Sequence, residues 1–261
     1  NQQLLDQQGA LGVYCKSPMI KRIGAGTFIL ILLLAGPASP DRVPKEYSEF
    51  TFARVAFNFS DGPGAYNRER QRPWEHDYPR SEDFFLAMVG QVTGVRTNVE
   101  SFEIVRLDSK ELFKYPFVYF SEPGFMDLTE KEEKNLREYF NRGGFAMFDD
   151  FRGEARANLE EQMFRVFPER RMVRIELKDP VFHSFYDITT LEMAPPYVNY
   201  NSGLPSFWGM KDETGRVILM ANADNDFGEY WEDIDLGAEA LHPAVQSFQF
   251  GVNYLIYAMT H

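Results

Sequence analysis

Short apolar runs alternate with segments of helical periodicity along most of this chain, and this alternation restricts its fold more than any other feature. The clearest runs, residues 117–121 and 145–148, are continuously apolar, as is typical of parallel strands that helices cover on both faces. Between them, Thr129 and Glu132 form a capping box that opens a helix ending near Arg142. Strand, helix and strand in this order predict an α/β domain with a mainly parallel sheet.

The same reasoning extends along residues 50–261, which we expect to form a single domain. Runs rich in apolar residues predict strands, and apolar residues three and four apart predict helices. The predicted strands are 52–59, 102–107, 117–121, 145–148 and 172–177, followed by a hairpin of 207–210 and 216–221. The predicted helices are 81–93, with Ser81 as its N-cap, then 129–142, 155–167 and 243–259.

Composition excludes several classes of protein. The chain has 261 residues, of which 44% are hydrophobic and 25% charged, so it is neither disordered nor collagen-like. Its net charge of −12 gives no electrostatic reason to bind nucleic acid or anionic lipid. The single cysteine, Cys15, rules out disulfides within the chain and thiolate metal clusters.

Residues 1–38 have the pattern of a targeting segment. Lys21 and Arg22 precede an apolar run over 23–35, and small residues follow at Gly36 and Ala38. This layout is typical of a bacterial secretory signal peptide, and the run is short for a membrane-spanning helix. We therefore expect an exported protein, periplasmic or otherwise extracytoplasmic.

Two further expectations concern this end of the chain. Pro37 lies beside the cleavage-like position, so an uncleaved membrane anchor is the alternative, and it would be the only contact with a membrane. Residues 1–18 are Gln-rich and do not begin with Met, so we expect them to lie upstream of a start at Met19. Residues 39–49 are predicted to be a linker.

Acidic residues follow several predicted strands. Ligands of parallel α/β sheets bind beyond the carboxyl ends of the strands, so these residues, with Arg54 in the first strand and Trp74 in the following loop, form a candidate ligand pocket. The acidic members are Asp61, Glu122, Asp149, Asp150, Asp224 and Asp226.

The adjacent pair Asp149 and Asp150 is the most specific of these signals, and it leaves three alternatives open. The two carboxylates can bind a divalent cation such as Mg²⁺ or Ca²⁺, which is the only cofactor that the sequence suggests. They can share a proton in acid–base chemistry. Alternatively, one caps the next helix and the other is solvated.

Two other segments carry weaker signals. Residues 222–229 are rich in oxygen ligands but lack the spacing of an EF-hand, so they are either a turn or part of a pocket. The loop over 60–79 contains arginines with Trp74, His76 and Asp77, which can clamp an anion or a sugar, or simply pack on the sheet.

Known catalytic motifs are missing. The histidines are not spaced as zinc ligands, and the sequence has no G-x-S-x-G, P-loop or G-x-G-x-x-G motif. We therefore assign no catalytic residue.

An ordered set of residues is similar to a known family. The chain resembles the bacterial domain-of-unknown-function family 4159 over about residues 50–261. The set consists of Arg54, Trp74, Asp77-Tyr78-Pro79, Tyr115-Pro116, Gly143-Gly144, Asp149-Asp150, Phe182, Phe185-Tyr186, Trp231 and Gly251-Val252-Asn253-Tyr254.

The resemblance implies a flavodoxin-like sheet related to class I glutamine amidotransferase-like and ThuA-like domains. It also implies an exported or membrane-tethered setting, and it carries no established reaction. In the amidotransferase relatives a cysteine nucleophile occupies the turn that here holds Asp149 and Asp150. Family members often have His-Pro where this chain has Asp179-Pro180, so no role for that histidine transfers.

Together these observations predict a non-catalytic binding or accessory module at the cell envelope. Its partner would be an envelope protein or a small polar ligand, not nucleic acid. The alternative is a carboxylate-dependent or metal-assisted hydrolase that acts on carbohydrate or a related envelope substrate. A purely structural envelope domain is the third hypothesis.

Overall fold

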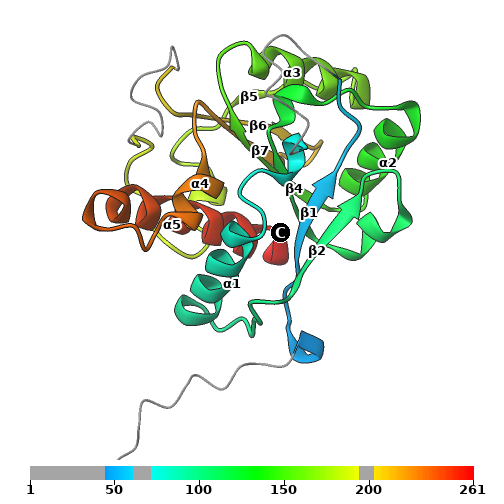
Figure 1. Ribbon diagram of the computed structural model, residues 1–261. Helices are drawn as coiled ribbons and strands as arrows, with labels where there is room; N and C mark the ends of the chain where they lie inside the picture. The colour runs from blue at the N-terminus through cyan, green and yellow to red at the C-terminus, as the bar shows by residue number, and fades with distance from the viewer. Residues whose placement is uncertain (1–44, 61–71, 194–202) are drawn as a thin grey trace, which may run out of the picture. The chain divides into compact units, whose positions relative to one another are not determined.

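The computed structural model describes residues 45–60, 72–193 and 203–261 (Figure 1). The predicted targeting segment, most of the linker, and Asp61 of the candidate pocket lie outside these residues. Among the described residues, no helix combines the length and the apolar character that crossing a membrane requires.

The described strands form one seven-stranded sheet in the order β2-β1-β3-β4-β7-β6-β5. The first five strands of that order run parallel; at one edge, β6 pairs antiparallel with β7, and β5 pairs antiparallel with β6. The parallel part has the strand order of flavodoxin-like domains, so the predicted fold class is confirmed. The strands are β1 (Phe52–Ala56), β2 (Phe102–Arg106), β3 (Phe117–Ser121), β4 (Phe145–Phe151), β5 (Val173–Arg174), β6 (Ser206–Lys211) and β7 (Val217–Ala223).

Helices cover both faces of the sheet (Figure 1). The α-helices are α1 (Arg80–Val92), α2 (Glu130–Asn141), α3 (Ala155–Val166), α4 (Phe227–Glu232) and α5 (Ala238–Thr260). Short 3₁₀ helices are η1 (Lys45–Tyr47), η2 (Pro73–Glu75), η3 (Lys110–Lys114), η4 (Pro123–Phe125) and η5 (Pro180–Phe182).

The alternation of side chains along β3 shows how the two faces are filled. Phe117 and Tyr119 belong to a buried cluster with residues of α1, α4 and α5. Val118 and Phe120 belong to a second cluster with residues of α2 and α3. Because successive strand side chains point to opposite faces, a strand must be apolar throughout to fill both clusters, as the sequence predicts.

The fourth strand is longer than predicted. It continues to Phe151, so Asp149 and Asp150 lie within it instead of after it. Phe148 pairs with Ala221 and Phe151 pairs with Ala223, which leaves β4 one residue longer than β7 over this stretch. The extra residue is a β-bulge, and bulges re-aim side chains at the rims of sheets. An apolar pattern cannot reveal two buried aspartates in a strand.

Other boundaries also differ from the predictions. The first strand ends at Ala56, and the strand predicted over 172–177 covers only Val173–Arg174. Ser81 does not cap α1, which begins at Arg80, because the Ser81 hydroxyl accepts a hydrogen bond from Arg54. The sequence did not predict α4.

Candidate functional site

The carboxyl ends of the parallel strands meet at one edge of the sheet and carry a cluster of ionisable side chains. They come from four different connections of the chain. The strand order reverses direction between β1 and β3, and ligands of such sheets bind outside the strand ends at that point. The loop after β1 supplies His76 and Asp77, the end of β3 supplies Glu122, the bulge of β4 supplies Asp150, and α4 with its N-cap supplies Asp226, Glu229 and Glu232.

Four acidic residues at this edge have left-handed backbone conformations. They are Asp77 (φ 62°), Glu122 (φ 46°), Asp150 (φ 53°) and Asp224 (φ 56°), and they are the only non-glycine residues with positive φ in the described part of the chain. Such conformations are uncommon for residues with a side chain and tend to gather at functional sites. Their concentration here distinguishes this edge from the rest of the fold.

His76 lies between two carboxylates. Its Nδ1 is 2.8 Å from Asp77 Oδ1 and 3.2 Å from Asp150 Oδ2. The distances are those of ion pairs, but the nitrogen is not aligned with either oxygen as a hydrogen-bond donor. Asp150 and then Asp77 raise the pKa of His76 to about 12, against the effect of burial. Without a ligand, the histidine is therefore the cation of this cluster.

Asp149 has a different environment from its neighbour. Its carboxylate accepts hydrogen bonds from Tyr119 Oη (3.1 Å), Asn222 Nδ2 (3.0 Å) and the backbone nitrogens of Phe227 (2.6 Å) and Gly228 (3.0 Å). Four donors occupy its two oxygens. Complete burial nevertheless raises its pKa to about 7. Asp149 thus fastens the first turn of α4 to β4 and is not available as a ligand.

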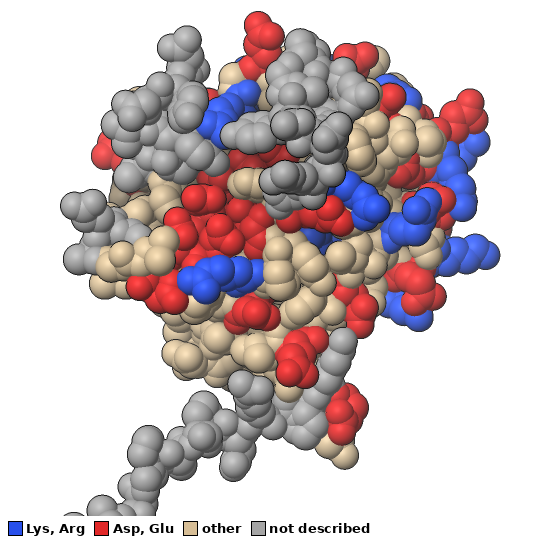
Figure 2. Space-filling model, in the orientation of Figure 1, with Lys and Arg blue, Asp and Glu red and all other residues tan. Residues whose placement is uncertain are grey.

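The remaining acids crowd one another. Burial and then Asp150 raise the pKa of Glu122 to about 8. Burial and then Asp77 raise the pKa of Glu229 to about 7. Like charges in a partly desolvated site disfavour ionisation of both partners. Figure 2 shows acidic side chains gathered near the middle of one face, while Lys and Arg side chains lie mostly to its right.

The acids and the histidine form two groupings that suit a metal ion. One oxygen or nitrogen from each of His76, Asp150 and Asp226 lies within 4.8 Å of the others. Asp77, Glu229 and Glu232 form a second grouping with the same property. His76 and Asp77 are in contact, so the two groupings adjoin.

Arg54 lies beneath the cluster in the protein interior and holds the turn that carries His76 through hydrogen bonds. Its guanidinium donates to the carbonyl oxygens of Trp74 (3.1 Å) and His76 (2.7 Å) and to Ser81 Oγ (3.0 Å), and it pairs with Glu82. It also lies over the ring of Tyr119 at 4.8 Å. Arg54 is only 1% exposed. It therefore fixes the turn that carries His76. The sequence had suggested that Arg54 lines a ligand pocket, but the buried guanidinium does not.

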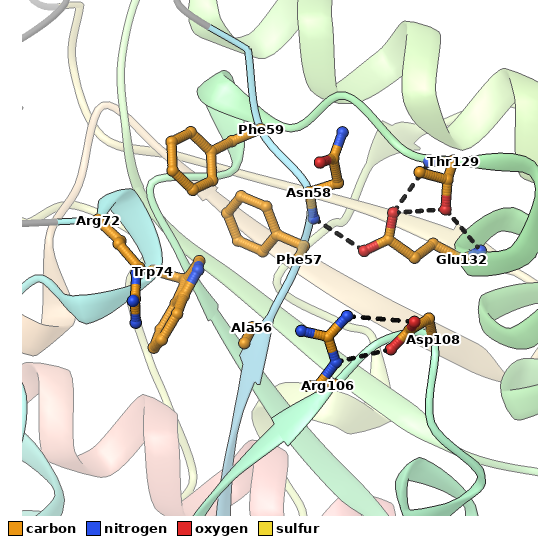
Figure 3. A pocket seen from close by; sticks show the side chains of 10 residues that line it. All are labelled: Ala56, Phe57, Asn58, Phe59, Arg72, Trp74, Arg106, Asp108, Thr129 and Glu132. Atoms are coloured by element: carbon orange, nitrogen blue, oxygen red, sulfur yellow. Dashed lines mark hydrogen bonds and ion pairs between the residues drawn. The ribbon is translucent and has the colours of Figure 1, made fainter.

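Trp74 faces a separate pocket (Figure 3). This pocket has a volume of about 360 Å³ and lies beyond the end of β1. The Arg72 guanidinium lies 5.2 Å from the Trp74 ring, and Arg106 forms two hydrogen bonds with Asp108, of 2.9 and 3.2 Å. The lining residues are Ala56, Phe57, Asn58, Phe59, Arg72, Trp74, Arg106, Asp108, Thr129 and Glu132. The structure thus separates Trp74 from the acidic residues.

The predicted acids divide in the structure. Asp150 and Asp226 come together with His76, and Glu122 lies near enough to Asp150 for that charge to raise the pKa of Glu122. Asp224 instead closes a loop by accepting from the backbone nitrogens of Gly153 and Gly203. Neither Asp149 nor Asp150 caps α3, whose N-cap is Glu154.

His76 and Asp77 were predicted only as part of a loop that binds an anion or a sugar or packs on the sheet, and Glu229 only as part of a turn or a pocket; their meeting with Glu232 and the strand-end acids was not predicted. The length of the loop over 60–79 was the available signal, because long loops in compact domains are usually functional.

The fold and the site define a flavodoxin-like α/β domain with an acidic cluster at the carboxyl ends of its parallel strands. Residues 51–259 match the family model described as Domain of unknown function (DUF4159). The chain belongs to this family, which confirms the resemblance found in the sequence. A comparison with curated proteins gives no match.

Proposed function

We propose that this protein is an exported cell-envelope module that binds a small polar ligand at the acidic end of its sheet, without catalysing a reaction. The observation that carries the proposal is the placement of His76 among carboxylates from three separate connections, those of Asp77, Asp150 and Asp226. Export rests on the pattern of Lys21, Arg22 and the apolar run over 23–35.

The excess of acids in the cluster indicates the chemistry of the ligand. Burying a carboxylate is costly unless a cation or a hydrogen-bond donor compensates its charge. Raised pKa values at Glu122 and Glu229 show that protons compensate it in part. A ligand with positive charge or several N–H and O–H donors would replace those protons with direct contacts.

The non-catalytic part of the proposal rests on the bulge near the end of β4. We infer that this domain is related to class I glutamine amidotransferase-like domains, in which a turn after the matching strand carries a cysteine nucleophile. Here the positions are Asp149 and Asp150, and Asp149 is fully engaged in holding α4. An envelope protein that presents a basic or donor-rich group is a suitable partner for the acids that remain.

Thermal unfolding tests the proposal. The purified chain is heated with and without divalent cations, polyamines and cell-wall sugars. A ligand at 100 times its dissociation constant adds about 2.7 kcal/mol of stability, which is roughly 5 to 10 °C for a domain of this size. We expect Asp150→Asn to abolish the shift and Asp224→Asn, at the same edge, to retain it. An equal shift in both variants would place the ligand elsewhere.

One observation favours a second candidate, a carboxylate-dependent or metal-assisted hydrolase that acts on carbohydrate or a related envelope substrate. Glu122, whose pKa is raised to about 8, keeps a proton at neutral pH and can donate it to a leaving group. Turnover of envelope glycans that falls about 10²- to 10⁴-fold in Glu122→Gln, with ligand binding intact, would favour this function over the first.

A further inference from the structure

We propose that the acidic cluster binds two divalent cations and that Asp77 bridges them. This inference rests on the proposed function and deepens it, because it names the ligand and the atoms that hold it. Three observations carry it: the distances from His76 Nδ1 to two carboxylate oxygens, one buried oxygen without a hydrogen-bond partner, and two glutamates on one face of α4.

The first ion is indicated by the atoms around His76. Nδ1 of His76 is 2.8 Å from Asp77 Oδ1 and 3.2 Å from Asp150 Oδ2. Ligands that bind one ion at about 2.1 Å, with angles of about 90 to 110°, lie roughly 3.0 to 3.4 Å apart. The observed spacing is close to this range, whereas the alignment expected of hydrogen bonds is missing. An ion between these three atoms, with Asp226 nearby, accounts for both facts.

The second ion is indicated by the other oxygen of Asp77. Asp77 Oδ2 is buried and has no hydrogen-bond partner, although the side chain is only 1% exposed. A buried carboxylate oxygen without a partner is unfavourable, because it has lost its water and gained no donor or cation in exchange. This oxygen faces α4, because a Cβ on Gly228 would approach it to 2.4 Å. Glycine at this position therefore leaves the space that the oxygen occupies.

The next residues of α4 complete the second set of ligands. Glu229 and Glu232 are three residues apart, so they lie on one face of the helix. Each places a carboxylate oxygen within 4.8 Å of Asp77. Three carboxylates favour hard ions such as Mg²⁺, Mn²⁺ or Ca²⁺, and the histidine of the first set also accepts Mn²⁺ or Zn²⁺. Mn²⁺ suits both positions.

The bridging role of Asp77 follows from its two oxygens, since Oδ1 contacts His76 of the first grouping and Oδ2 lies towards Gly228 in α4, the helix that carries Glu229 and Glu232 of the second. Paired metal ions in proteins lie about 3.5 to 4 Å apart, a spacing that one carboxylate can bridge. His76 can bind an ion only after it releases its proton, so ion binding at this position is coupled to proton release. Asp149 is excluded as a ligand because four donors already occupy its oxygens.

Equilibrium dialysis of the purified chain against Mn²⁺, followed by metal analysis and electron paramagnetic resonance, tests this inference. We expect two Mn²⁺ per chain and the spectrum of an exchange-coupled pair. Asp77→Asn should remove the coupling and at least one ion. Glu232→Gln, at a partly exposed position, should weaken the binding of one ion by about tenfold or more and leave the affinity for the other unchanged. The matched control is Asp224→Asn, whose residue is also left-handed and acidic but outside both sets; it should retain two ions.

The outcomes separate this inference from the proposed function. One ion per chain, or two ions without coupling, would overturn the bridged pair. No binding of Mn²⁺, Zn²⁺, Mg²⁺ or Ca²⁺, with an Asp150-dependent shift by a polyamine or sugar, would overturn the metal site and preserve the proposed function. No ion and no ligand of any kind would overturn both. If Asp77→Asn does not fold, Glu232→Gln, which lies at the edge of the cluster, replaces it as the test. Unchanged affinity for both ions in Glu232→Gln would then overturn the second ion.

Discussion

Two neighbouring groups of buried charges in this domain differ in how their charges and hydrogen-bonding atoms are paired. Around Arg54, one guanidinium faces one carboxylate, that of Glu82, and its other donors reach the hydroxyl of Ser81 and two carbonyl oxygens. In the acidic cluster above it, His76 faces Asp77 and Asp150 without aligned hydrogen bonds. In the first group the charge of Arg54 is balanced by Glu82 and its other donors have acceptors, so we assign this group a structural role. In the second group, Nδ1 of His76 and Oδ2 of Asp77 have no aligned hydrogen-bond partner, and on this difference we base the proposal that the second group binds a ligand.

The largest expected effect comes from breaking the complete group. Arg54→Met leaves Glu82 buried without its partner, and loss of one member of a buried ion pair typically costs about 3 to 5 kcal/mol. Denaturant unfolding of the purified chain measures this loss. The double variant Arg54→Met/Glu82→Leu should regain much of the stability, since it removes both charges. A loss below about 1 kcal/mol in the single variant would mean that the network does not hold the domain together.

The same comparison shows what the sequence could predict. Apolar periodicity predicted the α/β sheet because β3 and the first part of β4 must fill two buried clusters. The capping box at Thr129 predicted the start of α2, because the motif satisfies local donors without help from the rest of the fold. These features depend on near neighbours in the sequence.

The candidate site, in contrast, depends on contacts between residues that are far apart in the sequence. Arg54 and Trp74 were predicted as pocket residues from their residue types, but tertiary hydrogen bonds place Arg54 under the site and Trp74 in another pocket. His76 gave no metal-like spacing because its companions, Asp150 and Asp226, come from other strand ends. Asp149 and Asp150 look equivalent in the sequence, and only the bulge in β4 separates their roles.

The next effect contrasts these adjacent aspartates. Asp149→Asn turns an acceptor of four hydrogen bonds into a group that must direct an NH₂ at one of the donors, which should cost about 1 to 3 kcal/mol. Asp150→Asn removes one of several crowded charges, and Asn tolerates the left-handed backbone at this position. It should be neutral or stabilising in metal-free buffer. Thermal unfolding of the two variants side by side gives the comparison, and equal losses would contradict it.

The third effect is the response of stability to pH. The folded-state pKa of Glu122 is raised from 4.5 to about 8, so between these values the folded state keeps a proton that the unfolded state releases. Stability from this group therefore falls as the pH rises through that window. In chelator, Glu122→Gln should gain about 1 kcal/mol relative to the parent chain between pH 5 and pH 8.5, a value reduced for partial exposure.

An exposed glutamate is the control for this pH effect. Arg137 lowers the pKa of Glu169, so Glu169→Gln should leave the slope above pH 5 unchanged. If both variants follow the parent chain across pH 5 to 8.5, Glu122 is ionised in the folded state and the cluster is less crowded than its geometry indicates.

The smallest expected effect contrasts two arginines. Arg80, at the rim of the cluster, donates to the carbonyl oxygen of Glu232 at 2.7 Å and pairs with Asp235, and its side chain is 46% exposed. Exposed ion pairs contribute about 0 to 1 kcal/mol, so Arg80→Gln should change stability far less than Arg54→Met. Removing this charge also makes the cluster more negative, which should strengthen cation binding about two- to threefold at low salt and not at 1 M salt. Titration of Mn²⁺ at both salt concentrations measures the effect, and an unchanged affinity at low salt would show that the rim arginine does not contribute to the field at the site.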